Sequence, residues 1–409
     1  MRLALCLALL LATTTAAETR THEESGLRYE LLRAPGWNQV DRLPLLVCLH
    51  GSGDELANFV RYLHACLPEV TRYHRVFVQS PDAGWGSARV PGIAAVTRAV
   101  REELKVGDVF AVGFSAGGGM TGVLLQREPA LFTGGLIAGA FGPSFRPAAD
   151  GPWAWWSLGS ADEHLGEGGA QVHVERLQRL GWPAERYSVD VVEGLGHELG
   201  GASCLRGLRW LLERSASEAP RAEPLAAVGA VTSALEAGDL EALEDAGRRA
   251  LATRHPEVRA ALHDALAPAL KDRRAPLRAA AIALLGRTGD PRAAAPLRGL
   301  LRKRTVRKDA ELCAGVVVAL GGLAGEAGAK QLAQLVKSTS LERELRLAAV
   351  GQLARQGDAG VEELLGLQAW AERKRDDELT AACDAALQAL TGLDFAGSLE
   401  WKAYRKRFR

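Results

Sequence analysis

Hydrophobic residues in the first half of the chain gather in short continuous runs that are separated by amphipathic stretches. The runs are rich in β-branched and aromatic residues and predict buried strands, whereas the stretches between them predict helices. Strands and helices that alternate at this spacing predict a mostly parallel sheet covered by helices on both faces. The predicted strands are 43–50, 75–80, 108–114, 134–141, 153–158 and 187–193, and the predicted helices lie around 55–66, 93–105, 117–127, 170–180 and 203–215.

The pattern changes near residue 216. Pro220 and Pro224 stand among small and charged residues, which predicts a linker over 216–224. From 225 to 392 the chain is rich in alanine and leucine and holds no strand candidate. Residues 393–409 are basic and partly aromatic, and we expect a terminal cap that is solvated or that touches an anionic surface.

The second half also repeats itself. Each repeat has an apolar helix, a glycine-containing break and a second helix, with Leu284, Leu320 and Leu353 in matching places. Repetition of this kind predicts a solenoid in which each helical pair packs against its neighbours, and a two- or three-helix bundle is the alternative. The repeats are clearest in 275–302, 311–337 and 344–370.

Length and composition bound the remaining possibilities. A chain of 409 residues predicts two domains, and 47% apolar with 24% charged residues is typical of a globular protein. The net charge of +1 gives no overall basic field, so we expect no nucleic-acid partner.

The N-terminus begins MRLALCLALLLATTTAAETR. A positive start, a short apolar core and small residues before Glu18 predict a signal peptide over 1–17 and export to the periplasm or the medium. A membrane anchor is the alternative, but the apolar run is too short to span a bilayer, and no later stretch is long enough. We therefore expect no transmembrane span.

Five cysteines remain after Cys6 is removed with the leader. They are scattered, odd in number and without a Cys-x-x-Cys pair, so the sequence predicts no zinc site and leaves any disulfide pairing open. Cys48 and Cys383 lie in apolar segments, where packed thiols are expected.

The stretch Gly113-Phe114-Ser115-Ala116-Gly117 follows a predicted strand and opens a predicted helix. It has the Gly-x-Ser-x-Gly form of a nucleophile elbow, in which a strained turn exposes the serine hydroxyl. The flanking glycines would let strand and helix approach closely. A glycine-rich turn that merely contains a serine is the alternative, so the rest of the chain has to supply a base and a carboxylate.

Both follow in the required chain order of serine, acid and histidine. Asp162 comes just after strand 153–158, at the sheet edge where the elbow lies, although an aspartate there also suits a helix N-cap. Glu163 is the fallback for the acid. His197 stands in a glycine-rich loop after strand 187–193, which favours it as the base over a plain surface histidine. The other candidates fit the order or the loop placement less well, namely His50, His64, His74, His164 and His173.

Acyl transfer also needs donors for a developing oxyanion. The turn after strand 43–50 can supply the backbone N–H of Ser52 or Gly53, and Ala116 supplies the second donor directly after the serine. We expect His50 to shape that turn rather than to transfer protons. Trp85 borders the same edge and is a candidate wall of the substrate pocket, or a loop tryptophan packed on the domain, whereas Trp153, Trp155 and Trp156 belong to the core.

Taken together, LHGSGD, GFSAGGGM, GSAD and GLGHE resemble the loops of α/β-hydrolases of the esterase kind, including carboxylesterases and polyester or feruloyl esterases. The resemblance covers 27–215 and implies a Ser115–Asp162–His197 triad with Ser52 and Ala116 as oxyanion donors. Residues 225–392 resemble HEAT-type repeats through their period and the GDPRAAAPL turn. The implied architecture is an α/β-hydrolase domain over 18–215 followed by an all-α HEAT-like solenoid.

The sequence thus predicts an exported serine hydrolase that cleaves small or exposed carboxylic esters without a metal or cofactor. The short connection between strands 134–141 and 153–158 leaves little room for a lid and favours an open pocket. We expect the repeats to contact a protein partner or a substrate surface. The alternatives are a serine peptidase of the same fold and a catalytically inert hydrolase-fold scaffold.

Overall fold

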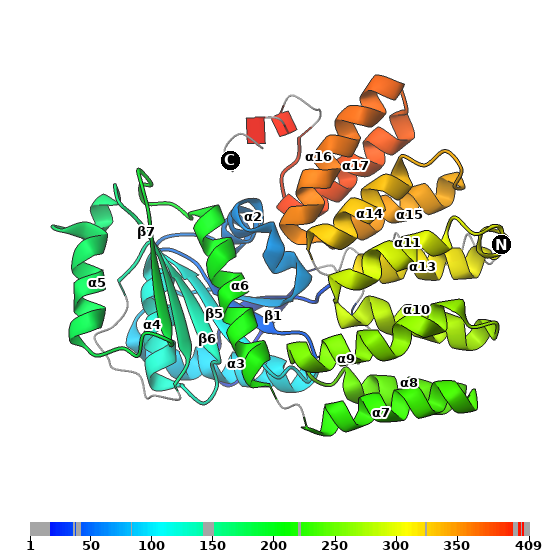
Figure 1. Cartoon of the computed structure of the whole chain (residues 1–409). Helices are drawn as coiled ribbons and strands as arrows, with labels where there is room; N and C mark the ends of the chain where they lie inside the picture. The colour runs from blue at the N-terminus through cyan, green and yellow to red at the C-terminus, as the bar shows by residue number, and fades with distance from the viewer. Residues whose placement is uncertain are drawn as a thin grey trace. The chain divides into compact units, whose positions relative to one another are not determined.

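The structure is a computed structural model that describes residues 17–35, 37, 42–82, 84–141, 151–219, 222–323, 325–395, 400–401 and 403–404. The described chain divides into two compact units between Ser215 and Ala216, and both appear in Figure 1. The first, called the sheet unit below, holds every described strand, and the second, the helical unit, is all helical. The predicted class, α/β followed by all-α, is therefore confirmed.

An eight-stranded sheet forms the centre of the sheet unit, in the order β1-β2-β4-β3-β5-β6-β7-β8. The six strands from β3 to β8 pair in parallel and correspond to the six predicted ones, whereas β1 and β2 pair antiparallel with each other and β2 antiparallel with β4. Strands β1 and β2 were not predicted, because neither carries a continuous apolar run. Their bounds are β1 Glu18–Thr21, β2 Arg28–Leu32, β3 Leu45–Leu49, β4 His74–Val78, β5 Val109–Phe114, β6 Gly134–Ala138, β7 Trp153–Gly159 and β8 Tyr187–Val192.

Helices cover both faces of this sheet. Alternate residues of β3 enter opposite cores, since Val47 belongs to the core that includes residues of α3, α4 and α5, while Cys48 belongs to the core that includes residues of α2 and α6. Every residue of β3 is buried, which is why its sequence is continuously apolar. Trp153, Trp155 and Trp156 are core residues, as predicted. The helices are α2 Leu56–Cys66, α3 Val90–Leu104, α4 Ala116–Arg127, α5 Gly169–Arg179 and α6 Gly201–Glu218.

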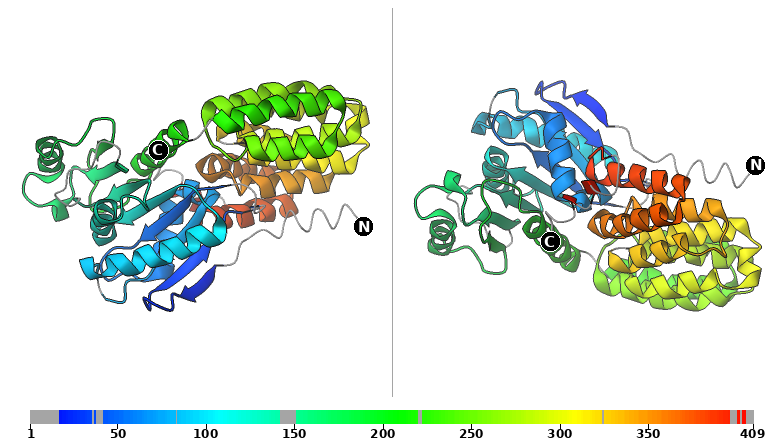
Figure 2. Two further views of the ribbon diagram at one scale, coloured as in Figure 1. Left: turned by 90° about the horizontal axis from the view of Figure 1, so that it is seen from below. Right: turned by 90° about the horizontal axis from the view of Figure 1, so that it is seen from above.

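The helical unit is a stack of two layers, visible in Figure 2. In one layer α7, α9, α10, α13, α15 and α17 each contact the next, and in the other α11, α14 and α16 do the same. This order is typical of a solenoid in which each pair buries its apolar face only against its neighbours. The bounds are α7 Ala222–Ala237, α8 Leu240–Ala250, α9 Pro256–Leu266, α10 Ala275–Thr288, α11 Ala294–Leu300, α12 Arg304–Arg307, α13 Ala310–Gly322, α14 Glu326–Val336, α15 Arg343–Leu353, α16 Gly357–Lys374 and α17 Asp377–Thr391.

Matching positions in the repeats pack alike. Leu284, Leu320 and Leu353 are buried on α10, α13 and α15, which follow one another in the first layer. At the contact between α10 and α13, a Cβ added to Gly286 would lie 2.5 Å from the Cα of Ala319. A side chain there would collide with backbone, so the glycine permits the close approach of the two helices.

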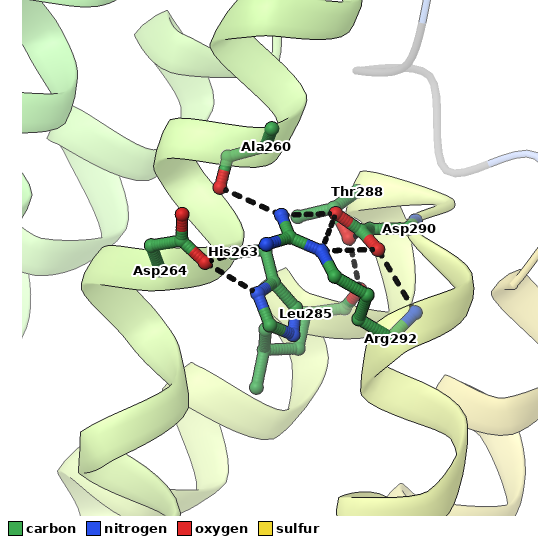
Figure 3. A network of polar contacts seen from close by, with 7 residues as sticks. All are labelled: Ala260, His263, Asp264, Leu285, Thr288, Asp290 and Arg292. Carbon is green, nitrogen blue, oxygen red and sulfur yellow. Dashed lines mark hydrogen bonds and ion pairs between the residues drawn. The ribbon is translucent and has the colours of Figure 1, made fainter.

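Polar groups join consecutive repeats at the turn around Asp290 (Figure 3). Asp290 accepts a hydrogen bond from the backbone N–H of Arg292 (2.9 Å) and so caps a short 3₁₀ turn, Pro291–Ala293. The Arg292 guanidinium donates to Asp264 (2.9 Å) and to the carbonyl of Ala260 (3.2 Å), both on α9. The predicted GDPRAAAPL turn therefore ties the start of one helix to the preceding repeat.

The structure agrees only in part with the predicted linker and the predicted C-terminal cap. Residues 216–218 continue α6 and residues 222–224 begin α7, so helix extends into the predicted linker. Pro224 is compatible with α7 because the first N–H groups of a helix have no intrahelical acceptor. In the predicted C-terminal cap, Trp401 is buried against Phe395 with ring centroids 4.8 Å apart, so this tryptophan is not solvated. Pro220, the predicted signal peptide up to residue 16 and the last five residues lie outside the described part of the chain.

The five described cysteines are free thiols, and Cys48 and Cys383 are buried, as expected of packed thiols. Burial raises the pKa of Cys383 to about 12, which keeps that thiol protonated. No helix in the described segments has the length and apolar character that a membrane span needs.

Candidate active site

Ser115 lies between the end of β5 at Phe114 and the start of α4 at Ala116. Its backbone has φ 54° and ψ −123°, a left-handed conformation that is costly for a residue with a side chain. The Ser115 N–H donates to the carbonyl of Ala138 (2.9 Å), which fixes the turn against β6. The side chain is half-exposed, so the strained turn presents the hydroxyl at the edge of the sheet.

The glycines on either side of Ser115 are required by close packing. A Cβ on Gly113 would collide with the carbonyl of Gly117, and a Cβ on Gly117 would collide with the carbonyl of Leu49. Strand and helix therefore approach each other over two positions that have no room for a side chain. This is the arrangement that the Gly-x-Ser-x-Gly pattern predicts.

The structure brings Ser115, Asp162 and His197 together. His197 Nε2 lies 2.9 Å from Ser115 Oγ, and His197 Nδ1 lies 2.9 and 3.0 Å from the two carboxylate oxygens of Asp162. The carboxylate can only accept from Nδ1–H, so Nε2 is left to accept from the serine hydroxyl. Asp162 has no exposed side-chain surface and the His197 side chain is 20% exposed.

Asp162 follows β7 and combines the two roles that its sequence context allows. One carboxylate oxygen accepts the backbone N–H of His164 (3.0 Å) and caps the 3₁₀ turn Glu163–Leu165, while the carboxylate also faces His197. Glu163 is exposed and has no recorded contact with His197 among the described residues. The geometry therefore favours Asp162 over Glu163.

The loop that carries His197 is held from several sides. The N–H of Ala161 donates to the carbonyl of Leu195 (3.0 Å), so this loop and the Asp162 turn are joined by backbone. The N–H of Leu199 donates to the hydroxyl of Tyr62 (2.8 Å). Burial raises the pKa of Tyr62 to about 12, so the hydroxyl stays neutral. Tyr62 was not predicted, because nothing in the sequence of α2 pairs it with a loop 137 residues away.

The turn after β3 lies against the serine, since a Cβ on Gly51 would be 3.5 Å from Ser115 Cβ. His50 shapes this turn, as predicted. Its Nε2 accepts from the N–H of Ser80 (3.0 Å), so Nδ1 carries the proton and donates to the carbonyl of Gly51 (2.7 Å). Both ring nitrogens of His50 are thus engaged in holding the backbone.

Two backbone donors remain free at this turn and at the elbow. Within the described segments, neither the N–H of Ser52 nor that of Ala116 donates to a protein acceptor. Ala116 is the first residue of α4, where the helix dipole favours negative charge. These donors have the character that an oxyanion requires.

Trp85 borders the same turn. Its indole Nε1 donates to the carbonyl of His50 (2.8 Å), and its ring lies 5.1 Å from the imidazole of His50. The side chain is partly buried against the core. Trp85 therefore has a structural task at the turn, and its role as a pocket wall remains a prediction.

His164 is a neighbour of the site. In the sequence it fits the role of the base less well than His197. Its ring stacks on His197 with centroids 4.0 Å apart and planes 30° apart, and Nδ1 lies 3.6 Å from Asp162. The signal that could have found it is its position two residues after the candidate acid. His50, His64, His74 and His173 are all buried, and of these His50 holds the turn beside Ser115.

Asp162, His164 and His197 also form a candidate set of metal ligands, because one ligand atom of each lies within 4.8 Å of the others. The atoms of Asp162 and His197 already share hydrogen bonds with each other. A cation bound there would take the place of the proton between acid and base, so these residues fit acid–base chemistry better than a resident metal.

No protein-family model matches the chain, and no curated protein matches it. Among solved structures, a thermostable esterase aligns at a TM-score of 0.39 and 17% identity over 50% of this chain and 64% of its own. A carboxylesterase from Mesorhizobium loti aligns at 0.37 and 17% over 47% of this chain and 98% of its own. Dipeptidyl peptidase 4 from Porphyromonas gingivalis aligns at 0.35 and 13% over 45% and 32%, respectively. At these scores the similarities say nothing about activity, so the function has to be argued from the residues themselves.

Proposed function

We propose that this chain is an exported serine hydrolase that cleaves carboxylic esters through an acyl-enzyme on Ser115. The observation that carries the proposal is a pair of hydrogen bonds on a strained turn. One joins the Asp162 carboxylate to His197 Nδ1 and the other joins His197 Nε2 to Ser115 Oγ, each at 2.9 Å. A strained, partly exposed serine bonded to an oriented imidazole is the arrangement of an activated nucleophile.

The geometry supports the following reaction. His197 Nε2 takes the proton from Ser115 Oγ as the hydroxyl adds to the ester carbonyl. The resulting oxyanion accepts hydrogen bonds from the N–H groups of Ala116 and Ser52. The imidazolium then gives its proton to the departing alcohol oxygen, which leaves an acyl group on Ser115. Water, deprotonated by His197, adds to the acyl carbon, and collapse returns the proton to Ser115 and releases the acid.

Asp162 acts through His197 rather than on the substrate. It selects the tautomer with a proton on Nδ1 and stabilises the imidazolium that forms during each half-reaction. Its burial matters because a carboxylate shielded from water interacts more strongly with a developing positive charge. His164 supports the carboxylate through its backbone N–H.

The helical unit is proposed to be a HEAT-type accessory domain that contacts a protein partner or a substrate surface. The support is its two-layer stack, in which helices contact the next helix of their own layer, and its repeated turn sequence. We propose export on the basis of the N-terminal sequence. We propose that Trp85 forms a wall of the substrate pocket, because it lies beside the turn after β3 that holds Ser52.

A fluorophosphonate probe tests the proposal. We expect the full chain to be labelled once, on Ser115, and the folded Ser115→Ala variant to remain unlabelled. A parallel series of p-nitrophenyl esters of increasing acyl length, with matching anilides, separates esterase from peptidase activity. Absence of both labelling and hydrolysis in the folded protein would favour the inert scaffold instead.

A further inference from the structure

A hollow of about 260 Å³ lies in the helical unit, between two consecutive repeats. One side is formed by the end of α11 and by α12, and the other by α14 and the segment that follows it. The lining residues are Arg298, Leu301, Arg302, Arg307, Gln334, Leu335, Ser338, Ser340 and Leu341. Among the described residues of its wall, the hollow therefore has three arginines and no acidic residue.

These three arginines differ from others in the helical unit. Arg274, Arg292 and Arg343 each bind a carboxylate. By contrast, the guanidinium groups of Arg298, Arg302 and Arg307 have no hydrogen bond or ion pair with any residue that the structure describes. Three like charges that face one hollow without a counter-charge repel one another, and an anion between them would turn that repulsion into attraction.

Two further features point to a ligand rather than to a bare charged surface. The Nε atom of Arg298 is buried and has no hydrogen-bond partner in the described chain, which is a costly state for a guanidinium donor. Ser338 and Ser340 place their hydroxyls 3.0 Å apart in the same wall. Guanidinium forks and hydroxyls together surround an oxyanion with donors from several directions.

We propose that this hollow, the Arg298–Arg302–Arg307 pocket, binds a doubly charged tetrahedral oxyanion, either inorganic phosphate or the phosphate of a small monoester. Three guanidinium groups match the charge and the several acceptor oxygens of a phosphate better than those of a single carboxylate. The buried side chains of Leu301 and Leu335 give the hollow an apolar part that suits a small organic group attached to the phosphate. The proposal does not depend on the hydrolase function.

Isothermal titration of the full chain with inorganic phosphate and with glycerol phosphate tests it. Arg302→Gln and Arg307→Gln remove exposed charges from the wall and should each weaken binding by about tenfold or more, as expected for a lost charge-assisted hydrogen bond. Arg304→Gln is the matched control, because Arg304 is exposed in the same basic run but does not line the hollow. Unchanged circular dichroism establishes that each variant is folded.

The pocket is supported if wild type binds and the two wall variants bind more weakly than Arg304→Gln. Tighter binding of glycerol phosphate than of inorganic phosphate would identify a monoester as the ligand, and equal binding would identify the free anion. The proposal is overturned if wild type shows no heat of binding at millimolar phosphate. Equal weakening in Arg304→Gln would also overturn it, since that result indicates a diffuse basic field.

Discussion

In the sheet unit, groups far apart in the sequence meet at hydrogen-bond distance, as Ser115 and His197 do across 82 positions. In the helical unit, polar groups join neighbouring repeats, as Arg292 and Asp264 do across 28 positions. A parallel sheet collects the ends of distant strands at one edge, whereas a stack of repeats places each residue only near the next repeat. Convergent chemistry is therefore expected in the sheet unit, and extended binding surfaces in the helical unit.

The two units also differ in where they tolerate unfavourable states. The sheet unit holds Ser115 in a strained backbone and buries His64, His74 and His173. The helical unit instead has three arginines around one hollow whose guanidinium groups find no partner in the described part of the chain. Backbone strain at a single turn is typical of a reactive group. Positive charge without a nearby carboxylate favours the binding of an anion.

The largest expected effect is the loss of activity on changing the acid. Asp162→Asn should lower kcat for a small ester by about 10⁴-fold, because the amide favours the wrong imidazole tautomer. Glu163→Gln, the matched control one residue away, should stay close to wild type because Glu163 is exposed. Steady-state kinetics of both variants measures the two kcat values. A larger loss of kcat in Glu163→Gln than in Asp162→Asn would mean that the acid is Glu163.

Acid should destabilise the sheet unit before the helical unit. Burial, together with the nearby charges of Arg75 and Arg176, lowers the pKa of His74 and His173 to about 4 from the ordinary 6.5, and burial keeps the pKa of His64 well below 6.5. The unfolded chain binds these protons at higher pH than the folded chain does, so stability falls as pH drops below about 6.5, by about 1–2 kcal/mol for each of His74 and His173 at pH 5.

The helical unit is expected to lose stability only at lower pH. Hydrogen bonds from Arg274 hold the pKa of Asp272 at about 2, and a bond from Arg343 lowers the pKa of Asp376, so both carboxylates stay charged at pH 5. Urea unfolding at pH 7 and pH 5, followed by tryptophan fluorescence, tests this because most tryptophans lie in the sheet unit. An unchanged midpoint would contradict it, and His173→Phe should reduce the pH dependence.

A smaller effect is expected at the contact between repeats. Gly286→Ala should cost about 1–3 kcal/mol of stability in the helical unit, because the added Cβ would overlap the backbone of Ala319. Gly315→Ala is the control, since Gly315 lies in α13 with no neighbour within 4 Å of its added Cβ. Urea unfolding followed by far-ultraviolet circular dichroism measures both. Equal destabilisation would show that close helix approach is not the cause.

The smallest expected effect is on turnover after removal of the helical unit. A chain that ends at Ser217 retains the sheet, Ser115, Asp162 and His197, so it should hydrolyse small soluble esters at a rate close to that of the full chain. It should lose the phosphate binding proposed above. A folded truncation with collapsed small-ester turnover would refute the modular account, and a changed acyl-length preference would show that the repeats shape the pocket.

Sequence pattern predicted the parts that depend on local rules. Mostly apolar runs identified β3 to β8 because strands covered on both faces are mostly apolar, although β4 also buries His74 and Arg75. Chain order paired Ser115 with Asp162 and His197. The same rules missed the β1–β2 hairpin, whose short edge strand is polar. They also missed Tyr62, because its contact with the His197 loop joins a helix to a segment 137 residues away. His164 was ranked below His197, although it stands two residues after Asp162 and stacks on His197.

The account rests on acyl transfer to Ser115, and trapping the acyl-enzyme tests it most directly. The full chain is mixed with p-nitrophenyl acetate, quenched in acid within the first turnover, and examined by intact and peptide mass spectrometry. We predict one acetyl group, on Ser115, and neither acetylation of residue 115 nor turnover in a folded Ser115→Ala variant. Undiminished hydrolysis by Ser115→Ala, or an acetyl group that turns over on another residue, would contradict the account.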